Sequence, residues 1–77
     1  MSNIYRLQTI FRDIFDNLTL QITEETAPAN LAEWDSVATV QIVLATEAEF
    51  GVRFTTDEVA DIRSVADILN CLSRRTR

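Results

Sequence analysis

The chain has 77 residues, of which 47% are hydrophobic and 25% charged, so a single globular domain over residues 1–77 is expected. No apolar run approaches the roughly 18–20 residues that cross a bilayer, and the first residues lack the charged-then-apolar layout of a signal peptide. We therefore expect a cytoplasmic protein without a membrane span. Its small size and acidity favour a monomer.

The inventory of reactive side chains argues against an enzyme. Histidine is absent, which removes the usual proton-transfer group near neutral pH and any Ser-His or Cys-His nucleophile pair. The single cysteine, Cys71, cannot form an internal disulfide and is three ligands short of a structural zinc site. Hydrolysis by a metal held on carboxylates alone stays open, although a small helical domain offers little cleft for it. We expect no catalytic residue and no resident metal.

The net charge is −5, and it is unevenly distributed. All twelve acidic residues lie between Asp13 and Asp67, where the only basic residues are Arg53 and Arg63. Such an acidic segment repels phosphate backbones, so nucleic-acid binding is disfavoured and a basic protein surface is the natural partner. The alternative is that the charge only keeps a small domain soluble.

Apolar residues at helical spacing predict a first, amphipathic helix near residues 3–17. Six side chains form this stripe and are expected to face the core: Ile4, Leu7, Phe11, Ile14, Phe15 and Leu18. Residues 18–34 show no sustained period and contain the only proline, which predicts a long connection. Its apolar residues are expected to anchor it against the helices: Leu20, Ile22, Leu31 and Trp34.

A second helix is predicted over residues 36–50, because this run has no Gly or Pro and lies between a cap, Asp35, and a stop, Gly51. Its helical wheel has two apolar stripes. The first is assigned to the core: Ile42, Val43 and Phe50, completed by Thr39 and Thr46. The second is proposed as an exposed docking ridge, bordered by polar residues: Val37, Val40 and Leu44, with Gln41 and Glu47 beside them. The alternative is a helix buried on most sides.

Two further helices are predicted after residue 51. Thr55 and Glu58 have the spacing of a capping box, which opens a short third helix. A fourth helix opens near Ser64, and its apolar face is formed by Val65, Ile68, Leu69 and Leu72. Arg74 and Arg75 lie near its C-terminal end, where positive charge suits the helix dipole. Cys71 lies at the edge of that face and is expected to be packing. The fold class is therefore all-α, with four helices.

Ser36 follows the cap Asp35 and thus stands at a helix N-terminus. Free backbone N–H groups and the helix dipole stabilise an attached phosphate at such a position. A serine there is more often a simple capping residue, so this pattern alone does not decide between the two roles.

The sequence resembles the acyl carrier protein family over nearly its whole length. The resemblance rests on Trp34-Asp35-Ser36-Val37 after a long loop and on the helix ending Glu47-Ala48-Glu49-Phe50-Gly51. It implies a four-helix bundle of acyl-carrier type in which Ser36 is esterified by 4′-phosphopantetheine, donated from coenzyme A by a phosphopantetheinyl transferase. Asp35 would then cap the helix and help the transferase to position its metal ion.

The same resemblance implies that the protein carries acyl intermediates as thioesters between acyl-loading and acyl-transferring enzymes of fatty-acid-like, polyketide or other specialised biosynthesis, and these enzymes supply the catalysis. The apolar interior would shelter the acyl chain. An acidic face, with Glu47 and Glu49 foremost and Asp57 and Glu58 as candidates, would steer basic docking surfaces of these partners. The Trp-Asp-Ser motif and Gln41 are more similar to stand-alone carriers of specialised pathways, with polyketide, hydroxyacyl or aminoacyl cargo, than to the main fatty-acid carriers.

One alternative from a different class stays open on the residues alone. An unmodified acidic helical adaptor could bind a basic partner through the same ridge, with Ser36 serving only as a helix-capping residue.

Overall fold

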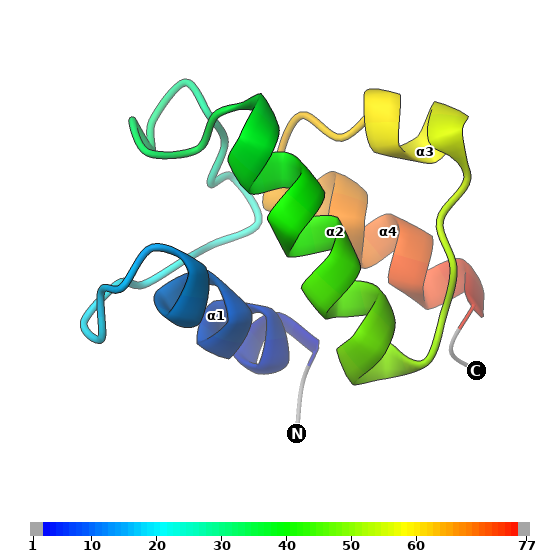
Figure 1. Cartoon of the computed structure of the whole chain (residues 1–77), viewed down its shortest axis with the longest axis horizontal. Helices are drawn as coiled ribbons and strands as arrows, with labels where there is room; N and C mark the ends of the chain where they lie inside the picture. The colour runs from blue at the N-terminus through cyan, green and yellow to red at the C-terminus, as the bar shows by residue number, and fades with distance from the viewer. Residues whose placement is uncertain (1–2, 76–77) are drawn as a thin grey trace.

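The computed structural model describes residues 3–75, which form four helices and no strand. They are α1 (Asn3–Ile14), α2 (Ser36–Phe50), the short α3 (Thr56–Ala60) and α4 (Val65–Arg75). Figure 1 shows the three longer helices around a common interior, with α3 at one edge. The predicted all-α class is confirmed. Within residues 3–75, no helix is long and apolar enough to cross a membrane.

Helix α1 ends earlier than the predicted residue 17. Asp16 adopts a left-handed conformation with φ of 50°, and the Asn17 N–H donates to the Arg12 carbonyl at 3.0 Å, which closes the last turn. Asp and Asn tolerate this conformation better than most residues, so the pair ends the helix. The turn directs Leu18 to the surface, where its side chain is 82% exposed. Its assignment to the core stripe was wrong.

The remainder of the stripe on α1 does face the interior. Leu7 and Phe11 are fully buried, and Ile10, which the stripe did not include, is buried beside them. The other stripe residues are half-buried and pack against the edge of the core: Ile4, Ile14 and Phe15. The predicted face of α1 therefore does point to the core, but the buried surface is wider than predicted because it includes Ile10.

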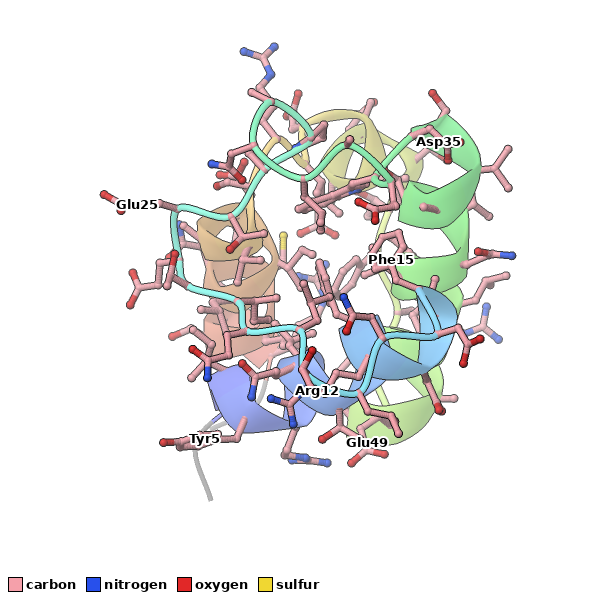
Figure 2. The ribbon with its side chains drawn as sticks, turned by 90° about the vertical axis from the view of Figure 1, so that its left-hand side faces the viewer. Tyr5, Arg12, Phe15, Glu25, Asp35 and Glu49 are labelled. Carbon is pink, nitrogen blue, oxygen red and sulfur yellow. The ribbon has the colours of Figure 1, made fainter. Side chains whose placement is uncertain are left out.

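The long connection packs against the helices, as expected. Ile22 and Trp34 are buried, while Leu20 and Leu31 are half-buried against the same core. Figure 2 shows the connection crossing the side of the molecule that α1 and α4 share. Its apolar anchors thus make it part of the packed structure.

Polar contacts also hold the backbone of this connection. On the α1 side, Arg12 Nε donates to the Leu20 carbonyl at 2.7 Å, and the Ile22 N–H donates to Gln8 Oε1 at 2.9 Å. On the other side, the Val65 N–H at the start of α4 donates to a carbonyl of the connection at 2.9 Å. The segment therefore bridges two helices.

Helix α2 has both predicted caps. The Asp35 backbone is extended, and its Oδ1 accepts a hydrogen bond from the Ala38 N–H at 2.8 Å. Gly51 ends the helix with φ of 66° and ψ of 38°, and its N–H donates to the Glu47 carbonyl at 2.9 Å. A glycine suits this left-handed position because it carries no Cβ.

The core-facing stripe of α2 is largely as predicted. Ile42 and Val43 are buried, Phe50 is half-buried, and Ala38 is a further buried residue near the first turn. Thr46 is fully buried, yet its hydroxyl has no hydrogen-bond partner among the described residues. A polar group is thus left unsatisfied in an apolar core.

Helix α3 is held by polar contacts and by Val59, which is half-buried and packs against the core. Its predicted capping box is present, with Glu58 N–H donating to Thr55 Oγ1 at 3.1 Å and Thr55 N–H donating to Glu58 Oε1 at 2.8 Å. No side chain of α3 is buried. Arg74 and Arg75 of α4 approach the Glu58 carboxylate at 3.5 and 2.5 Å, so two ion pairs tie α3 to α4.

Helix α4 presents its predicted apolar face to the core. Val65, Ile68 and Leu72 are fully buried, and Leu69 packs at the edge. Cys71 is buried on the same helix, in agreement with its expected packing role.

Candidate functional site

Ser36 is the first residue of the 15-residue helix α2, and it is exposed. The N–H groups of Ala38 and Thr39 already donate to the Asp35 side chain and carbonyl, at 2.8 and 3.0 Å. The N–H groups of Ser36 and Val37 have no partner among the described residues. An accessible hydroxyl therefore lies beside two free donors at the positive end of a helix dipole, and this arrangement fits a phosphate ester.

A buried tryptophan fixes this end of α2. Trp34 is 2% exposed, and its ring meets Phe11 of α1 edge-on, with centroids 5.3 Å apart. Its Nε1 donates to Thr39 Oγ1 at 2.6 Å, and Thr39 Oγ1 donates in turn to the Asp35 carbonyl at 3.1 Å. The residues on both sides of Ser36 are thereby held against α1.

Asp35 acts as the predicted cap through one carboxylate oxygen. The other oxygen, Oδ2, has no partner among the described residues, and the side chain is exposed. Figure 2 shows Asp35 at the start of α2. One oxygen is thus committed to the helix, while the second is available to an outside group.

The predicted ridge is exposed. Val37, Val40 and Leu44 are 66%, 52% and 60% exposed, and Gln41 beside them is exposed as well. The alternative of a helix buried on most sides is therefore excluded. These side chains continue along α2 from Ser36, so the structure brings the modification candidate and the ridge to one face. Their part in docking stays a prediction.

The two glutamates assigned to the acidic face lie differently from each other. Glu47 is half-buried, and its Oε2 accepts a hydrogen bond from the Phe54 N–H at 2.8 Å, which holds the segment after α2. Glu49 accepts from Arg6 Nε at 3.1 Å, on the side of α2 that faces α1 (Figure 2). The Arg6 guanidinium also lies 4.0 Å from the centre of the Phe50 ring. Glu49 is therefore not brought together with the ridge.

The two further acidic candidates lie on α3. Glu58 is engaged by its capping box and its arginines, whereas Asp57 is exposed and its carboxylate has no partner among the described residues. The Thr55 N–H bonded to the carboxylate lowers the pKa of Glu58 below its ordinary value. Partial desolvation opposes this effect, and the Arg75 guanidinium adds to it.

The sequence reasoning missed the surface beyond the ridge. A hollow of about 500 Å³ lies at the C-terminal end of α2, lined by Leu44, Glu47, Ala48, Gly51, Val52 and Arg53. The available signal was Arg53 itself, a basic residue two positions after the helix stop Gly51 in an acidic stretch. The contact between Trp34 and Thr39 was also missed, because they lie five positions apart across a helix boundary and no periodic pattern joins them.

Comparisons with known proteins agree with this geometry. The family model described as a phosphopantetheine attachment site matches residues 6–72. The chain is 36% identical over 66 residues to acyl carrier proteins of Rickettsia bellii strains RML369-C and OSU 85-389, which covers 82% of this chain and 77% and 82% of theirs. An acyl carrier protein of Acidothermus cellulolyticus is 29% identical over 70 residues, covering 91% of this chain and 83% of that protein.

A solved structure shows the same fold. The solution NMR structure of holo acyl carrier protein from Geobacter metallireducens superimposes with a TM-score of 0.86 at 24% identity, covering 97% of this chain and 86% of that one. The fold likeness, the family model and the curated relatives agree with the resemblance seen in the sequence. The chain therefore belongs to the acyl carrier protein family, and it is a carrier of acyl groups on a 4′-phosphopantetheine prosthetic group, not an enzyme.

Proposed function

We propose that Ser36 is the attachment point of the prosthetic group and that acyl intermediates travel on it, as thioesters, between partner enzymes. The observation that carries this proposal is the exposed Ser36 hydroxyl at the start of α2, beside two backbone N–H groups without partners. A phosphate ester at Ser36 Oγ would receive hydrogen bonds from these donors and favourable interaction with the helix dipole.

The neighbouring residues have distinct parts in this proposal. Asp35 holds the helix start through Oδ1 and offers Oδ2 to the metal ion of a phosphopantetheinyl transferase. Trp34 keeps the serine on a rigid support. The prosthetic group supplies the reactive thiol, which agrees with a chain whose one cysteine, Cys71, is buried.

The exposed ridge is the proposed docking surface for the transferase and for acyl-loading and acyl-transferring enzymes. Val37, Val40 and Leu44 offer apolar contact next to Ser36, and Gln41 offers a hydrogen-bonding group among them. Glu47 and Glu49 keep accessible surface and stay candidates for contact with basic partner side chains. We further propose that the protein works as a monomer in the cytoplasm, alongside these enzymes.

We propose a cargo outside the main fatty-acid pathway, such as a polyketide, hydroxyacyl or aminoacyl unit. The support is the chemistry of the exposed surface next to the serine: Gln41 is uncharged, and the ridge is apolar. A docking face of this kind suits partners that are selected by apolar fit more than by basic patches.

The attachment point can be tested by intact mass after incubation with coenzyme A, magnesium and a broad-specificity transferase. Wild type and a control variant, Ser73→Ala, which alters an exposed serine of α4, should each gain one prosthetic-group increment. Ser36→Ala should gain none while keeping its helical circular dichroism. A folded Ser36→Ala protein that is still modified would refute the proposal.

The same assay addresses the adaptor alternative. A wild-type protein that stays unmodified, while a known carrier is modified in parallel, would favour an unmodified acidic adaptor. An unmodified adaptor should then bind its partner equally well as wild type and as Ser36→Ala.

A further inference from the structure

Thr46 lies fully buried in the core-facing side of α2, and its Oγ1 has no hydrogen-bond partner within residues 3–75. A threonine inside a helix can bond its hydroxyl to the carbonyl four residues earlier. Thr9 does so with the Tyr5 carbonyl at 3.2 Å. Thr39 does so with the Asp35 carbonyl at 3.1 Å. The Thr46 hydroxyl makes no such bond, so its donor and its acceptor positions stay free.

The surroundings of this hydroxyl are apolar. One turn away on the same face of α2 are Ile42 and Val43, which are buried, and Phe50, which is half-buried. A hydroxyl left unpaired among such side chains destabilises the fold, whereas a valine would fill the same volume without this effect. Native proteins leave few buried polar groups unpaired, and a bound group is one physical reason for keeping one. A ligand that suits this position is mainly apolar and carries an oxygen that pairs with Thr46.

The side of the core next to α3 is where a chain can enter with the least disruption. No side chain of α3 is buried, and the segment between α2 and α3 contributes the half-buried Val52 and Phe54. These side chains already touch water, so moving them loses less packing than displacing the fully buried Leu7 and Phe11 of α1. An acyl chain is thus expected to enter between α2 and α3.

Thr46 and Ser36 lie on the same helix. Thr46 comes ten residues after Ser36, which is about 15 Å along the helix axis. The next residue, Glu47, accepts a hydrogen bond from the Phe54 N–H at 2.8 Å, so the segment that leads to α3 passes α2 at the level of Thr46. A chain that follows α2 from Ser36 on the α3 side therefore reaches Thr46.

We infer that Thr46 determines which cargo the interior accepts: its hydroxyl donates a hydrogen bond to a ketone within the carried chain, so the preferred class is an oxoacyl chain. A ketone oxygen is only an acceptor, and one donor satisfies it, whereas a hydroxyl on the chain would bring both a donor and an acceptor into apolar surroundings. Without the Thr46 hydroxyl, the desolvation of the ketone would be uncompensated. The inference rests on the proposed function, since the chain must be attached at Ser36, and it names the cargo class more narrowly.

Matched chains loaded on the full-length protein can test this inference. The probes are an octanoyl chain and three chains of the same length with a ketone at carbon three, five or seven. Each is transferred to Ser36 from a synthetic coenzyme A analogue, and intact mass confirms the loading. Carbon-13 labels in the chains then give the sheltered fraction, which is the part of the NMR signal protected from a dissolved paramagnetic agent.

The quantity compared is the ratio of sheltered to exposed chain, for a ketone chain relative to the octanoyl chain. For at least one ketone position, this relative ratio should be about fivefold higher or more in wild type than in Thr46→Val, as expected for one neutral hydrogen bond. A cross-relaxation signal should join that chain to the Thr46 methyl group. Thr46→Ser retains the hydroxyl and should keep the preference. The matched control Thr9→Val removes an exposed hydroxyl of α1 and should leave the preference unchanged.

Two results with folded, fully loaded proteins would overturn the inference alone. One is an equal relative ratio in wild type and Thr46→Val. The other is a loss in Thr46→Ser as large as that in Thr46→Val, which would show that the hydroxyl does not hold the ketone. Circular dichroism establishes the folding of each variant before loading. A wild type that takes up no chain, while a known carrier is loaded in parallel, would overturn attachment at Ser36 and this inference with it.

Discussion

Trp34 and Thr39 are joined by a hydrogen bond of 2.6 Å between the indole Nε1 and the threonine Oγ1. The bond connects the last buried residue of the long connection to the first turn of α2, across Ser36. Because Trp34 also packs edge-on against Phe11, the start of α2 is positioned by α1 as well as by its own cap. Local capping and tertiary packing thus support the same serine.

Replacing Trp34 with Phe should weaken this support. The ring contact with Phe11 is retained in part, while the bond to Thr39 is lost, so the free energy of unfolding should fall by about 1 kcal/mol or more. Denaturant unfolding gives this value. A double-mutant cycle with Thr39→Val isolates the pair, and an interaction energy near zero would show that the bond does not contribute.

Thr46→Val should raise the free energy of unfolding instead of lowering it. The Thr46 hydroxyl is buried without a partner, and valine replaces it with a methyl group of similar shape, so the variant should be more stable by about 1 kcal/mol. Thr39→Val is the matched control, since that hydroxyl is bonded on both sides and its loss should destabilise. A lower unfolding midpoint for Thr46→Val would mean that its hydroxyl is hydrogen-bonded in solution.

Gly51→Ala tests the strain at the end of α2. A Cβ at this position meets no atom within 4 Å, so the cost comes from the left-handed backbone alone, at φ of 66°. It should amount to about 1 kcal/mol, which lowers the melting temperature by roughly 4–8 °C in a domain of this size. Gly51→Asn should lose less, because Asn tolerates this conformation. Equal melting temperatures for Gly51→Ala and wild type would contradict the assignment.

The contacts of Glu58 predict a pH dependence. Its pKa is lowered in the folded state, so the carboxylate contributes stability that is fully present above its unfolded value of about 4.3. This contribution is lost as the pH falls through the lowered folded value. The stability difference between wild type and Glu58→Gln should therefore be largest near neutrality and shrink below pH 4.3 or so.

Asp57→Asn is the control for this pH series. Asp57 is the neighbouring carboxylate and has no ion pair within the described chain, so its substitution should change the profile much less. A wild-type advantage over Glu58→Gln that grows on acidification would contradict the sign of the shift.

The features that the sequence predicted correctly depend on local chemistry. Asp35 and Gly51 mark the ends of α2, because a capping carboxylate and a glycine in the left-handed conformation each act on the helical turn next to them. The exposure of Val40 and Leu44 was proposed from a second apolar stripe bordered by polar residues, with burial on most sides as the alternative, and the structure decides for exposure. These patterns span at most a few turns and need no partner element.

The features that it missed depend on segments far apart in the chain. Glu49 stands on the predicted helix, but its partner Arg6 lies 43 residues away, and no local pattern joins them. Leu18 continued the stripe of α1 by spacing alone, whereas the left-handed turn at Asp16 ended the helix first. An ion pair between distant segments and a single left-handed turn therefore could not be predicted from local patterns.

Val40→Asp tests whether the ridge serves partners or the fold. Val40 is half-exposed on α2, so an aspartate there remains in water and should change the free energy of unfolding by less than about 0.5 kcal/mol. Val43, one turn further along the helix, is buried, and Val43→Asp should unfold the protein or destabilise it severely. If the ridge docks the transferase, Val40→Asp should slow modification of Ser36 at least several-fold while its circular dichroism stays native. Native modification rates in a folded Val40→Asp protein would show that the transferase does not use this side chain, and loss of helical content would show that Val40 supports the core.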